Sequence, residues 1–386
     1  MSGVADNVEA TQRRVLVLGV EPNSLLNFRK GLLVALLKAG HEVHAASAAA
    51  DPDTLRGLAR LGVTHHQVYF ARTGMNPMKD GRTILSLTKL FRAVRPDCIL
   101  AYTPKPVMYG AIAAKLAGCP HFAALITGLG YSFNPGQELR RKFANHITRT
   151  LYRMALPLCK SVIFQNPDDL QHFKSLRLYP TTKPDLVVNG SGVNLTHFSV
   201  VPLPTKTVFL LIGRLLVDKG VREYAEATMI AKAAYPDISV RLLGPFDPSP
   251  NSVTKKELQQ WQDSGLEYLG STGDVRPYIA AASVIVLPSY REGTPRSVLE
   301  GMAMGRAIIT TDAPGCRETV VHGVNGLLVP LQDSAALANA MMELASDPDK
   351  IVAMGQHSRR MAEVKYESGA VALDTLQKAG ILPIAV

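Results

Sequence analysis

Two glutamates, Glu292 and Glu300, stand on either side of a Thr294-Pro295 pair in a segment suited to a charged ligand. Threonine is a favoured N-cap and proline fits the first helical position, so we expect a helix from here to about Met304. Its first turn would present backbone N–H groups and the positive end of the dipole to a diphosphate. The loop carboxylate could reach a sugar beyond the phosphates, and the helix carboxylate could accept hydrogen bonds from ribose hydroxyls. Taken alone, the pair is equally compatible with two surface acids that bind nothing.

Two cations precede this segment in the chain. Arg214 and Lys219 lie in one loop, after an apolar run at 207–212. A guanidinium fork and an ammonium point charge can reach the same anion. Fixed positive groups beside a diphosphate stabilise the charge that develops when a bond to it breaks. The alternative is a pair of solvated loop cations.

Short apolar runs alternate with longer helical stretches, which predicts parallel strands joined by crossover helices. A proline-bearing stretch at 197–205 interrupts this alternation and reads as a linker, after which the alternation restarts. We therefore expect an α/β fold of two Rossmann-like, doubly wound parallel-sheet domains, 1–197 and 198–371, with ligands at the carboxyl ends of the strands. The expected strands are 15–18, 43–46, 67–70, 98–102, 121–125, 161–165, 185–188, 207–212, 239–243, 266–268, 283–287, 307–310 and 326–329, and the expected helices include 25–39, 52–61, 83–94, 105–117, 138–156 and 220–234.

The net charge of +10 favours anionic partners: nucleic acid, anionic lipid or phosphorylated substrates. Nucleic acid is the weakest of the three, because the chain has no basic low-complexity tail and no aromatic-rich basic motif. No run approaches the ~20 apolar residues of a membrane span, and residues 1–12 lack an apolar signal region. We expect a cytosolic protein.

No metal and no cofactor are expected. The four cysteines are isolated in the sequence, which disfavours structural zinc and a disulfide framework. The Asp-Pro-Asp triplets at 51–53 and 347–349 precede expected helices, where aspartates serve as caps. His65 and His66 are adjacent and would point to opposite faces of a strand.

The segment 283–325 resembles the donor-binding signature of the GT-B retaining glycosyltransferases of family 4. Glu292 and Glu300 match that family's E-x7-E pair, and the likeness extends over nearly the whole chain. It is densest in the C-terminal half. Further matches are the P-G-x-x-E turn (Pro314, Gly315, Glu318) and the H-G-x-N-G continuation (His322, Gly323, Asn325, Gly326).

The resemblance implies that the C-terminal domain binds a nucleotide sugar, most simply a UDP-sugar, and that a helix at about 372–386 packs back onto the N-terminal domain. Glu292, Arg214 and Lys219 would act in catalysis. The implied donor-binding residues are Gly19, Gly213, Arg214, Lys219, Gly244, Glu292, Gly293, Thr294, Pro295 and Glu300.

Two N-terminal motifs, A-Y-T-x-K-P at 101–106 and L-N-F-R at 26–29, resemble a subgroup that elongates sugars on polyprenyl-diphosphate carriers. The position at which many family members carry a catalytic histidine holds Thr127 or Gly128, and His121 lies just upstream. The implied acceptor-binding residues are Asn27, Arg29, Thr103, Lys105, Thr127 and Gly128.

The resemblance implies a retaining, metal-independent transfer of an N-acetylhexosamine or hexose from a UDP-sugar to a polyprenyl-diphosphate-linked saccharide in bacterial cell-surface glycan synthesis. The basic amphipathic helix 138–156 either lies on an anionic membrane or packs on the core with a solvated face. The first would make the protein peripheral on the inner face of the cytoplasmic membrane. The alternatives are a sugar-nucleotide epimerase or a phosphorylase on the same architecture, a glycosyltransferase with a soluble acceptor, and a two-lobed sugar-binding module.

Overall fold

The computed structural model describes residues 12–70, 77–128, 139–249 and 251–384. The chain forms two compact units. The first consists of Met1–Phe164, Leu170–Val188 and Ala372–Val386, and the second of Gln165–Asp169 and Asn189–Val371. A short segment between β6 and the body of α7 therefore groups with the second unit, although the chain on both sides of it groups with the first.

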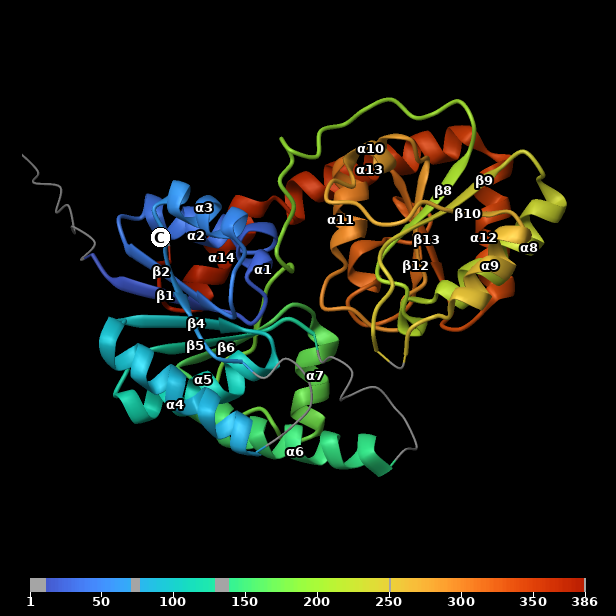
Figure 1. The fold of residues 1–386 in the computed structure, drawn as a ribbon. Coiled ribbons are helices and arrows are strands. Elements are labelled where there is room, and N and C mark those ends of the chain that lie inside the picture. Colours follow the sequence, from blue (N-terminus) through green and yellow to red (C-terminus); the bar gives the residue numbers. More distant parts are fainter. Residues whose placement is uncertain (1–11, 71–76, 129–138, 250, 385–386) are drawn as a thin grey trace, which may run out of the picture. The chain divides into compact units, whose positions relative to one another are not determined.

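The first unit is built on a parallel sheet with the strand order β3-β2-β1-β4-β5-β6-β7 (Figure 1). Helices α7 and α14 each begin in a segment that groups with the second unit. The strands are β1 (Arg14–Leu18), β2 (Glu42–Ser47), β3 (Thr64–Gln67), β4 (Cys98–Tyr102), β5 (Phe122–Ile126), β6 (Ser161–Phe164) and β7 (Leu186–Val187), and the helices are α1 (Asn23–Asn27), α2 (Lys30–Lys38), α3 (Pro52–Leu61), α4 (Pro77–Val94), α5 (Pro104–Ala117), α6 (Leu139–Ala155), the 3-10 turn η2 (Leu156–Leu158), α7 (Pro167–Ser175) and α14 (Ser368–Lys378).

Both faces of this sheet are covered by helices, as an all-parallel sheet requires. One core lies between the sheet and α4, α5, α6 and α7, with Phe91, Val107 and Tyr152 among its buried side chains. The other lies between the sheet and α1, α2, α3 and α14, with Leu33 and Leu376 buried (Figure 1). The central strands β1, β4 and β5 are buried almost throughout.

Three expected elements of this unit are wrong in their bounds. The helix expected at 83–94 is α4, which begins earlier, at Pro77. The helix expected at 25–39 is split into α1 and α2, because the chain leaves helical geometry at Phe28 and Arg29, where the Arg29 guanidinium lies over the Tyr102 ring. The strand expected at 67–70 is β3, which ends at Gln67. Gln67 pairs with Ser47, the last residue of β2, so β3 ends where its neighbouring strand ends.

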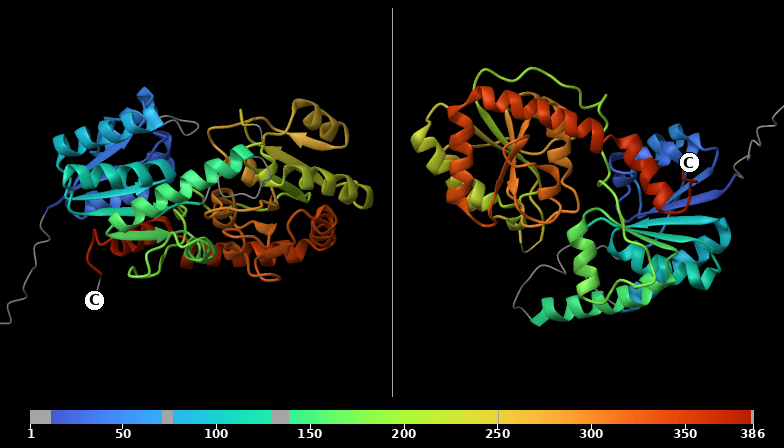
Figure 2. Two further views of the ribbon diagram at one scale, coloured as in Figure 1. Left: turned by 90° about the horizontal axis from the view of Figure 1, so that it is seen from below. Right: turned by 180° about the vertical axis from the view of Figure 1, so that it is seen from behind.

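The second unit is built on a parallel sheet with the strand order β10-β9-β8-β11-β12-β13. Its two cores lie on opposite faces of that sheet, one including α8 and α12 and the other including α11 (Figure 2). The strands are β8 (Val208–Ile212), β9 (Ser239–Leu243), β10 (Leu266–Tyr268), β11 (Val284–Leu287), β12 (Ala307–Thr311) and β13 (Gly326–Val329), and the helical elements are η3 (Val217–Lys219), α8 (Val221–Ala234), α9 (Lys255–Asp263), α10 (Arg276–Ala280), α11 (Arg296–Ala303), η4 (Arg317–Thr319), α12 (Ser334–Ser346) and α13 (Pro348–Lys365).

The predicted pair of doubly wound parallel sheets is confirmed. In the first unit the strand order reverses between β1 and β4, and in the second between β8 and β11. Loops leave such a reversal point in opposite directions and open a crevice at the carboxyl ends of the two strands. Two loops in each unit are therefore placed to bind a ligand: those after β1 and β4, and those after β8 and β11.

Several smaller expectations can be checked in the described residues. Asp51 and Asp347 accept hydrogen bonds from the backbone N–H groups of Thr54 and Lys350, which confirms both as helix caps. His65 contacts Ser47 and His66 contacts His44, so the two rings do point to opposite faces of β3. No described helix is long and apolar enough to cross a bilayer.

Helix α6 spans most of the segment expected to be basic and amphipathic. The side chains of residues 138–143, including Arg140, Arg141 and Lys142, lie outside the described part of the structure. In the rest of the helix Thr148 and Tyr152 are buried against the core, and Arg153 is exposed. This described portion has a core-facing side and a solvated side.

Arg306, just before β12, is a fully buried cation that binds four backbone carbonyls. Its guanidinium donates to Val201 and Pro202, in the stretch that precedes β8, at 3.0 and 3.3 Å, and to Ile279 and Ala280 of α10 at 3.0 and 3.1 Å. Burial lowers the pKa of Arg306 to about 10. This side chain fastens the start of the second unit to its helical layer.

Replacing Arg306 with lysine should destabilise the second unit by about 2 kcal/mol or more, because an ammonium cannot reach carbonyls spread around a planar fork. Trp261 is the only tryptophan in the sequence and packs against one core of this unit. Its fluorescence during urea unfolding therefore reports this unit. The exposed Arg360→Lys is the matched control and should change the free energy of unfolding by less than about 0.5 kcal/mol. Equal unfolding midpoints for the two variants would contradict this assignment.

Candidate functional site

The loops after β8 and β11 lie against each other at the carboxyl ends of their strands. The backbone N–H of Tyr290 donates to the carbonyl of Asp218 at 2.9 Å, and the Ser289 hydroxyl donates to the same carbonyl at 3.0 Å. Gly220 has a φ of +70°, and a Cβ there would collide with the Pro288 carbonyl. The β8 loop therefore approaches the β11 loop as closely as backbone atoms permit.

Lys219 and Glu292, one from each of these loops, form an ion pair. The side chains are 22 % and 14 % exposed, so both charges are largely withdrawn from water. Opposite charges attract more strongly where solvent screening is reduced. From the sequence we expect both residues to bind the same ligand, but the sequence did not predict their direct contact.

Arg214, the other predicted cation of the β8 loop, points elsewhere. Its guanidinium pairs with Asp247 of the β9 loop at 2.6 Å and is 60 % exposed. The β8 and β9 loops meet at two glycines: a Cβ on Gly244 would collide with the carbonyl oxygen of Gly213. Gly244 is thus needed for a close backbone approach, whereas Gly213 has room for a side chain.

The helix expected after Thr294 is α11, but its start differs from the prediction. Arg296 is the first helical residue and Pro295 occupies the N-cap position without a side-chain hydrogen bond. Thr294 is not the cap, because its hydroxyl donates to the carbonyls of Gln165 at 3.2 Å and Gly293 at 2.9 Å. The first turn of α11 consequently receives no side-chain cap, which leaves its N–H groups available to an anion.

Glu300 lies inside α11 and is buried, at 6 % exposure. Burial raises the pKa of its carboxyl above the ordinary value, and the Arg296 guanidinium, 2.6 Å away, opposes that shift. A buried carboxylate with one charged partner retains capacity to accept further hydrogen bonds. Ribose hydroxyls are donors of the kind predicted for it.

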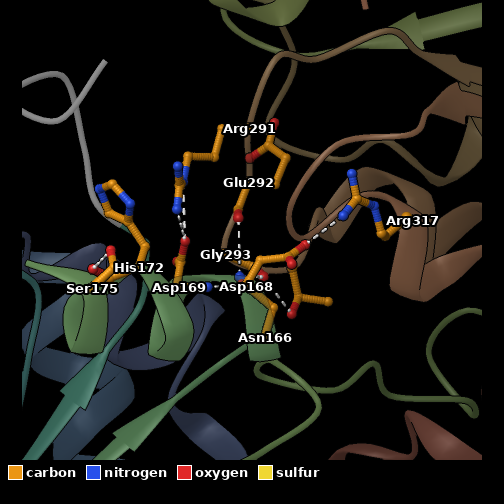
Figure 3. A network of polar contacts seen from close by, with 10 residues as sticks. Asn166, Asp168, Asp169, His172, Ser175, Arg291, Glu292, Gly293 and Arg317 are labelled. Carbon is orange, nitrogen blue, oxygen red and sulfur yellow. Dashed lines mark hydrogen bonds and ion pairs between the residues drawn. The ribbon is translucent and has the colours of Figure 1, made fainter. Parts of the chain in front are cut away.

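The Glu292 loop is held from one side by the segment that follows β6 (Figure 3). The Asn166 amide donates to the backbone carbonyls of Glu292 and Gly293 at 3.3 and 2.9 Å. The Asp169 side chain is 0 % exposed and accepts two hydrogen bonds from Arg291, at 3.0 and 2.5 Å. Burial raises the pKa of Asp169, and the Arg291 guanidinium opposes the rise.

Sequence reasoning missed this support. Asn166 and Asp169 stand more than a hundred positions before the loop that they hold, and their Asn-Pro-Asp-Asp run indicates only a helix start. That local reading is itself correct, since the Asn166 carboxamide oxygen accepts a hydrogen bond from the N–H of Asp169 at 2.7 Å. The same asparagine thus caps α7 through its oxygen and holds the Glu292 loop through its nitrogen.

The Pro314-Gly315 turn holds the same loop from another direction. The N–H of Glu292 donates to the Pro314 carbonyl at 2.9 Å. Gly315 has a φ of +80°, and a Cβ there would collide with the backbone carbonyls of both Glu292 and Gly293. Only glycine both adopts this positive φ without strain and leaves room for the two carbonyls. This explains why the P-G-x-x-E turn has a glycine at its second position.

In the first unit, three of the predicted acceptor residues, Arg29, Thr103 and Lys105, lie on the connections that leave β1 and β4 at the corresponding reversal point. The Arg29 guanidinium lies 4.6 Å from the centre of the Tyr102 ring, and the Tyr102 hydroxyl is 2.7 Å from that of Ser24. Gly19, at the end of β1, packs under the same ring, where a Cβ would collide with it. Gly19 therefore makes room for Tyr102, and its role in donor binding stays a prediction.

Thr103 directly follows β4 in a conformation that L-residues rarely adopt, with φ 68° and ψ 156°. Its hydroxyl is buried, and no hydrogen bond to it is present in the described part of the chain. It occupies the N-cap position of α5 without capping the helix. Two residues on, Lys105 lies 3.6 Å from the buried carboxylate of Asp80. Backbone strain of this kind is typical of ligand-binding positions.

The other residues singled out from the sequence lie at the ends of β5 and α1. Thr127 and Gly128 follow β5 and are half-buried, and Asn27 is exposed at the end of α1. His121 precedes β5, at the opposite end of that strand from Thr127, and its Nε2 contacts the carbonyl of Ala379 at 2.7 Å. Burial lowers the pKa of His121. This histidine helps to fasten the C-terminal helix to the first sheet.

Comparison with known families decides the class of protein. A family profile described as "Glycosyl transferases group 1" matches residues 206–347, and a "Glycosyl transferase 4-like domain" profile matches residues 29–190. Together the two span most of the chain. The chain belongs to the group 1 glycosyltransferases.

Solved structures place this glycosyltransferase in the GT-B fold. A sucrose-phosphate synthase from Thermosynechococcus elongatus superposes with a TM-score of 0.77 at 20% identity, covering 95% of this chain and 98% of that one. Anabaena HepE in complex with UDP and glucose superposes with a TM-score of 0.75 at 17% identity, covering 96% and 100%. At these identities the likeness shows the fold alone.

Two curated relatives extend the comparison to function. The N,N'-diacetylbacillosaminyl-diphospho-undecaprenol alpha-1,3-N-acetylgalactosaminyltransferase of Campylobacter jejuni is 26% identical over 364 residues, 90% of this chain and 93% of its own. The UDP-Gal:alpha-D-GlcNAc-diphosphoundecaprenol alpha-1,3-galactosyltransferase of Escherichia coli is 26% identical over 285 residues, 70% and 72% respectively. Both are named for lipid-linked saccharide acceptors.

Replacing Gly315 with alanine should displace the Glu292 loop and lower glycosyltransfer by about tenfold or more, because a misplaced polar group loses much of its effect on the reaction. Gly323→Ala is the matched control. Gly323 has nearly the same backbone conformation, with φ +79°, but no atom lies within 4 Å of the Cβ that alanine would add. Both variants carry the strain of alanine at positive φ, about 1 kcal/mol.

Turnover and thermal unfolding should be measured on both glycine variants. Turnover in Gly323→Ala should stay within about twofold of wild type, since backbone strain at position 323 leaves the Glu292 loop in place. Similar activity in the two variants would show that Gly315 is not needed for its close contact with the Glu292 loop.

Proposed function

We propose that this glycosyltransferase transfers a sugar from a UDP-sugar to a polyprenyl-diphosphate-linked saccharide, with retention of anomeric configuration. The observation that carries the proposal is the Lys219–Glu292 pair, set at the strand-order reversal of the second unit beside the uncapped start of α11. Cation, carboxylate and free N–H groups are the elements that a sugar diphosphate needs.

In the proposed complex the donor diphosphate binds at the first turn of α11. Lys219 offers its ammonium to a phosphate oxygen, and Arg214 can do so from its exposed position by exchanging Asp247 for the ligand. Glu292 then accepts hydrogen bonds from the sugar hydroxyls, and Glu300 accepts them from the ribose. The backbone of the Glu292 loop needs no rearrangement, because Asn166 and Gly315 already fix it.

The proposed reaction breaks the bond between the sugar C1 and the diphosphate oxygen. The acceptor hydroxyl oxygen bonds to C1 on the same face, and its proton passes to the departing diphosphate. Lys219, Arg214 and the α11 dipole stabilise the negative charge that builds up on that leaving group. We propose that these groups supply the stabilisation that a divalent cation provides in other transferases, so that no metal is required.

Two features of the relatives support the choice of donor and stereochemistry. The E. coli enzyme is named for UDP-Gal, and both curated relatives are named for alpha-1,3 linkages. A transferase that makes an α linkage from an α-linked nucleotide sugar retains the configuration at C1. The sugar transferred here is proposed to be a hexose or an N-acetylhexosamine on the same basis.

The acceptor is proposed to bind at the reversal point of the first unit. The strained Thr103, with its buried hydroxyl, stands at the start of α5, where the helix dipole and the N–H of Lys105 favour an anion, although Pro104 and Pro106 offer no N–H. Arg29 supplies a cation from the opposite loop. We propose that the diphosphate of the lipid carrier binds here, which would place the enzyme at the cytoplasmic membrane surface where such carriers are available.

Replacing Glu292 with glutamine should lower transfer about 100-fold or more while leaving the fold intact, because the amide keeps the volume but loses the charge that orients the sugar. Turnover is measured as UDP release and as glycosylated product. Glu363→Gln is the control: Glu363 is half exposed on α13 and pairs with Arg359. Unchanged turnover in Glu292→Gln would show that the charge of Glu292 does not orient the sugar.

The same assay separates the proposed reaction from epimerisation. Wild-type protein should release UDP only when an undecaprenyl-diphosphate-linked saccharide is supplied. Formation of an epimerised UDP-sugar in the absence of any acceptor would contradict the proposal and favour the epimerase.

Thr103→Gly should raise the acceptor KM about tenfold without lowering stability. Glycine relieves the strained backbone but removes the hydroxyl proposed to bind the acceptor. Thr103→Ser keeps the hydroxyl and should restore the acceptor KM, while the donor KM stays constant in both variants. An unchanged acceptor KM in Thr103→Gly would show that this hydroxyl does not contact the acceptor.

A further inference from the structure

Helix α4 carries an exposed stripe of mixed chemistry on its outer side. Met78, Arg82, Leu85, Lys89 and Arg92 recur at intervals of three or four, which places them along one helix face. All five are exposed, with Met78 at 88 % and Leu85 at 64 %. Apolar side chains so fully presented to solvent, interleaved with cations, are unusual on a helix that packs against a core.

The opposite side of α4 packs against the core of the first unit. Leu87, Phe91 and Val94 are buried in the core beneath the first sheet. Asp80 is the one acidic residue in the helix sequence, and it is buried beside Lys105 rather than exposed. The outer stripe therefore contains positive charge and apolar surface with no carboxylate of its own helix to neutralise it.

The end of α5 extends this stripe. The Arg92 guanidinium donates to the Leu116 carbonyl at 3.1 Å, so the two helices lie side by side there (Figure 1). Lys115 and Leu116 are both exposed, Leu116 at 54 %. The combined α4–α5 surface consists of Met78, Arg82, Leu85, Lys89, Arg92, Lys115 and Leu116.

We propose that the α4–α5 surface docks onto an anionic lipid bilayer. Its methionine and leucines can enter the boundary between head groups and acyl chains, and its cations can meet the lipid phosphates. Long basic side chains suit this position, since their stems lie on apolar surface while their charges reach outward. Charge complementarity favours this partner, because the two helices that form the surface expose cations and no carboxylate, which matches a layer of lipid phosphates.

This inference goes beyond the proposed reaction, since it concerns how the chain reaches a surface and not what its site does there. It also differs from the sequence-based expectation for residues 138–156. The described part of α6 turns Thr148 and Tyr152 into the core and uses Arg153 to bind the Leu176 carbonyl at 3.2 Å. The α4–α5 surface has the exposed apolar side chains that an interfacial helix needs.

The test is co-sedimentation of the whole protein with vesicles. Wild type should bind vesicles of phosphatidylcholine containing phosphatidylglycerol, bind phosphatidylcholine alone much more weakly, and be released from the anionic vesicles by added salt. Lys89→Glu with Arg92→Glu should weaken binding to the anionic vesicles about twentyfold or more, because two attractions become repulsions. Leu85→Ser should weaken it about fivefold at unchanged net charge.

The matched control is Lys255→Glu with Lys256→Glu on α9, which makes the same charge change at two exposed lysines of the second unit. This control should retain nearly all of the binding. Failure of wild type to bind anionic vesicles, or equal loss of binding in the two double variants, would overturn the proposal.

Binding and turnover are separable in this design. Sedimentation needs no donor, so its outcome does not depend on the proposed reaction. Transfer to a detergent-solubilised acceptor should be unchanged in Lys89→Glu with Arg92→Glu. A loss of that activity would show that the surface serves the catalytic site and would contradict a purely membrane-docking role.

Discussion

The site depends on a carboxylate and an ammonium held together at the ends of two neighbouring parallel strands. Lys219 and Glu292 are each largely withdrawn from water, so either charge left alone would be costly. Their loops are fixed by backbone contacts: the Asp218 carbonyl joins them, and Gly315 and Asn166 hold the Glu292 loop from outside. A bound diphosphate can take over the attraction of the ammonium and release the carboxylate for sugar hydroxyls without rebuilding that frame.

The two units place their ligand-binding groups by the same topological rule. In each, the strand order reverses between the first and fourth strands in sequence, and a helix begins soon after the fourth. The second unit sets a lysine, a carboxylate and the uncapped α11 at this point, and the first sets Arg29, Thr103 and α5. Both arrangements suit an anion at a helix start, as expected for an enzyme whose proposed donor and acceptor each carry a diphosphate.

Local signals predicted most of the fold. The strands 98–102, 239–243, 266–268 and 326–329 and the helix 52–61 have the expected bounds, because apolar runs and caps specify them within a few residues. The errors arise where contacts between residues far apart in the sequence decide the local structure. Arg29 breaks a periodic helix to reach Tyr102, and Thr294 gives up its capping role to bond with Gln165. Glu292, Glu300 and Lys219 could be chosen from motifs, but Asn166 and Asp169 could not, since their role exists only after folding brings the segment 165–169 against the loop.

The most direct measurement is an experimental structure of the protein with UDP bound. The account predicts that the diphosphate lies at the first turn of α11 within hydrogen-bond reach of Lys219, with the ribose against Glu300 and the Glu292 backbone unmoved between Asn166 and Gly315. A diphosphate bound away from α11, with Lys219 and Glu292 still paired to each other and facing no ligand, would contradict it.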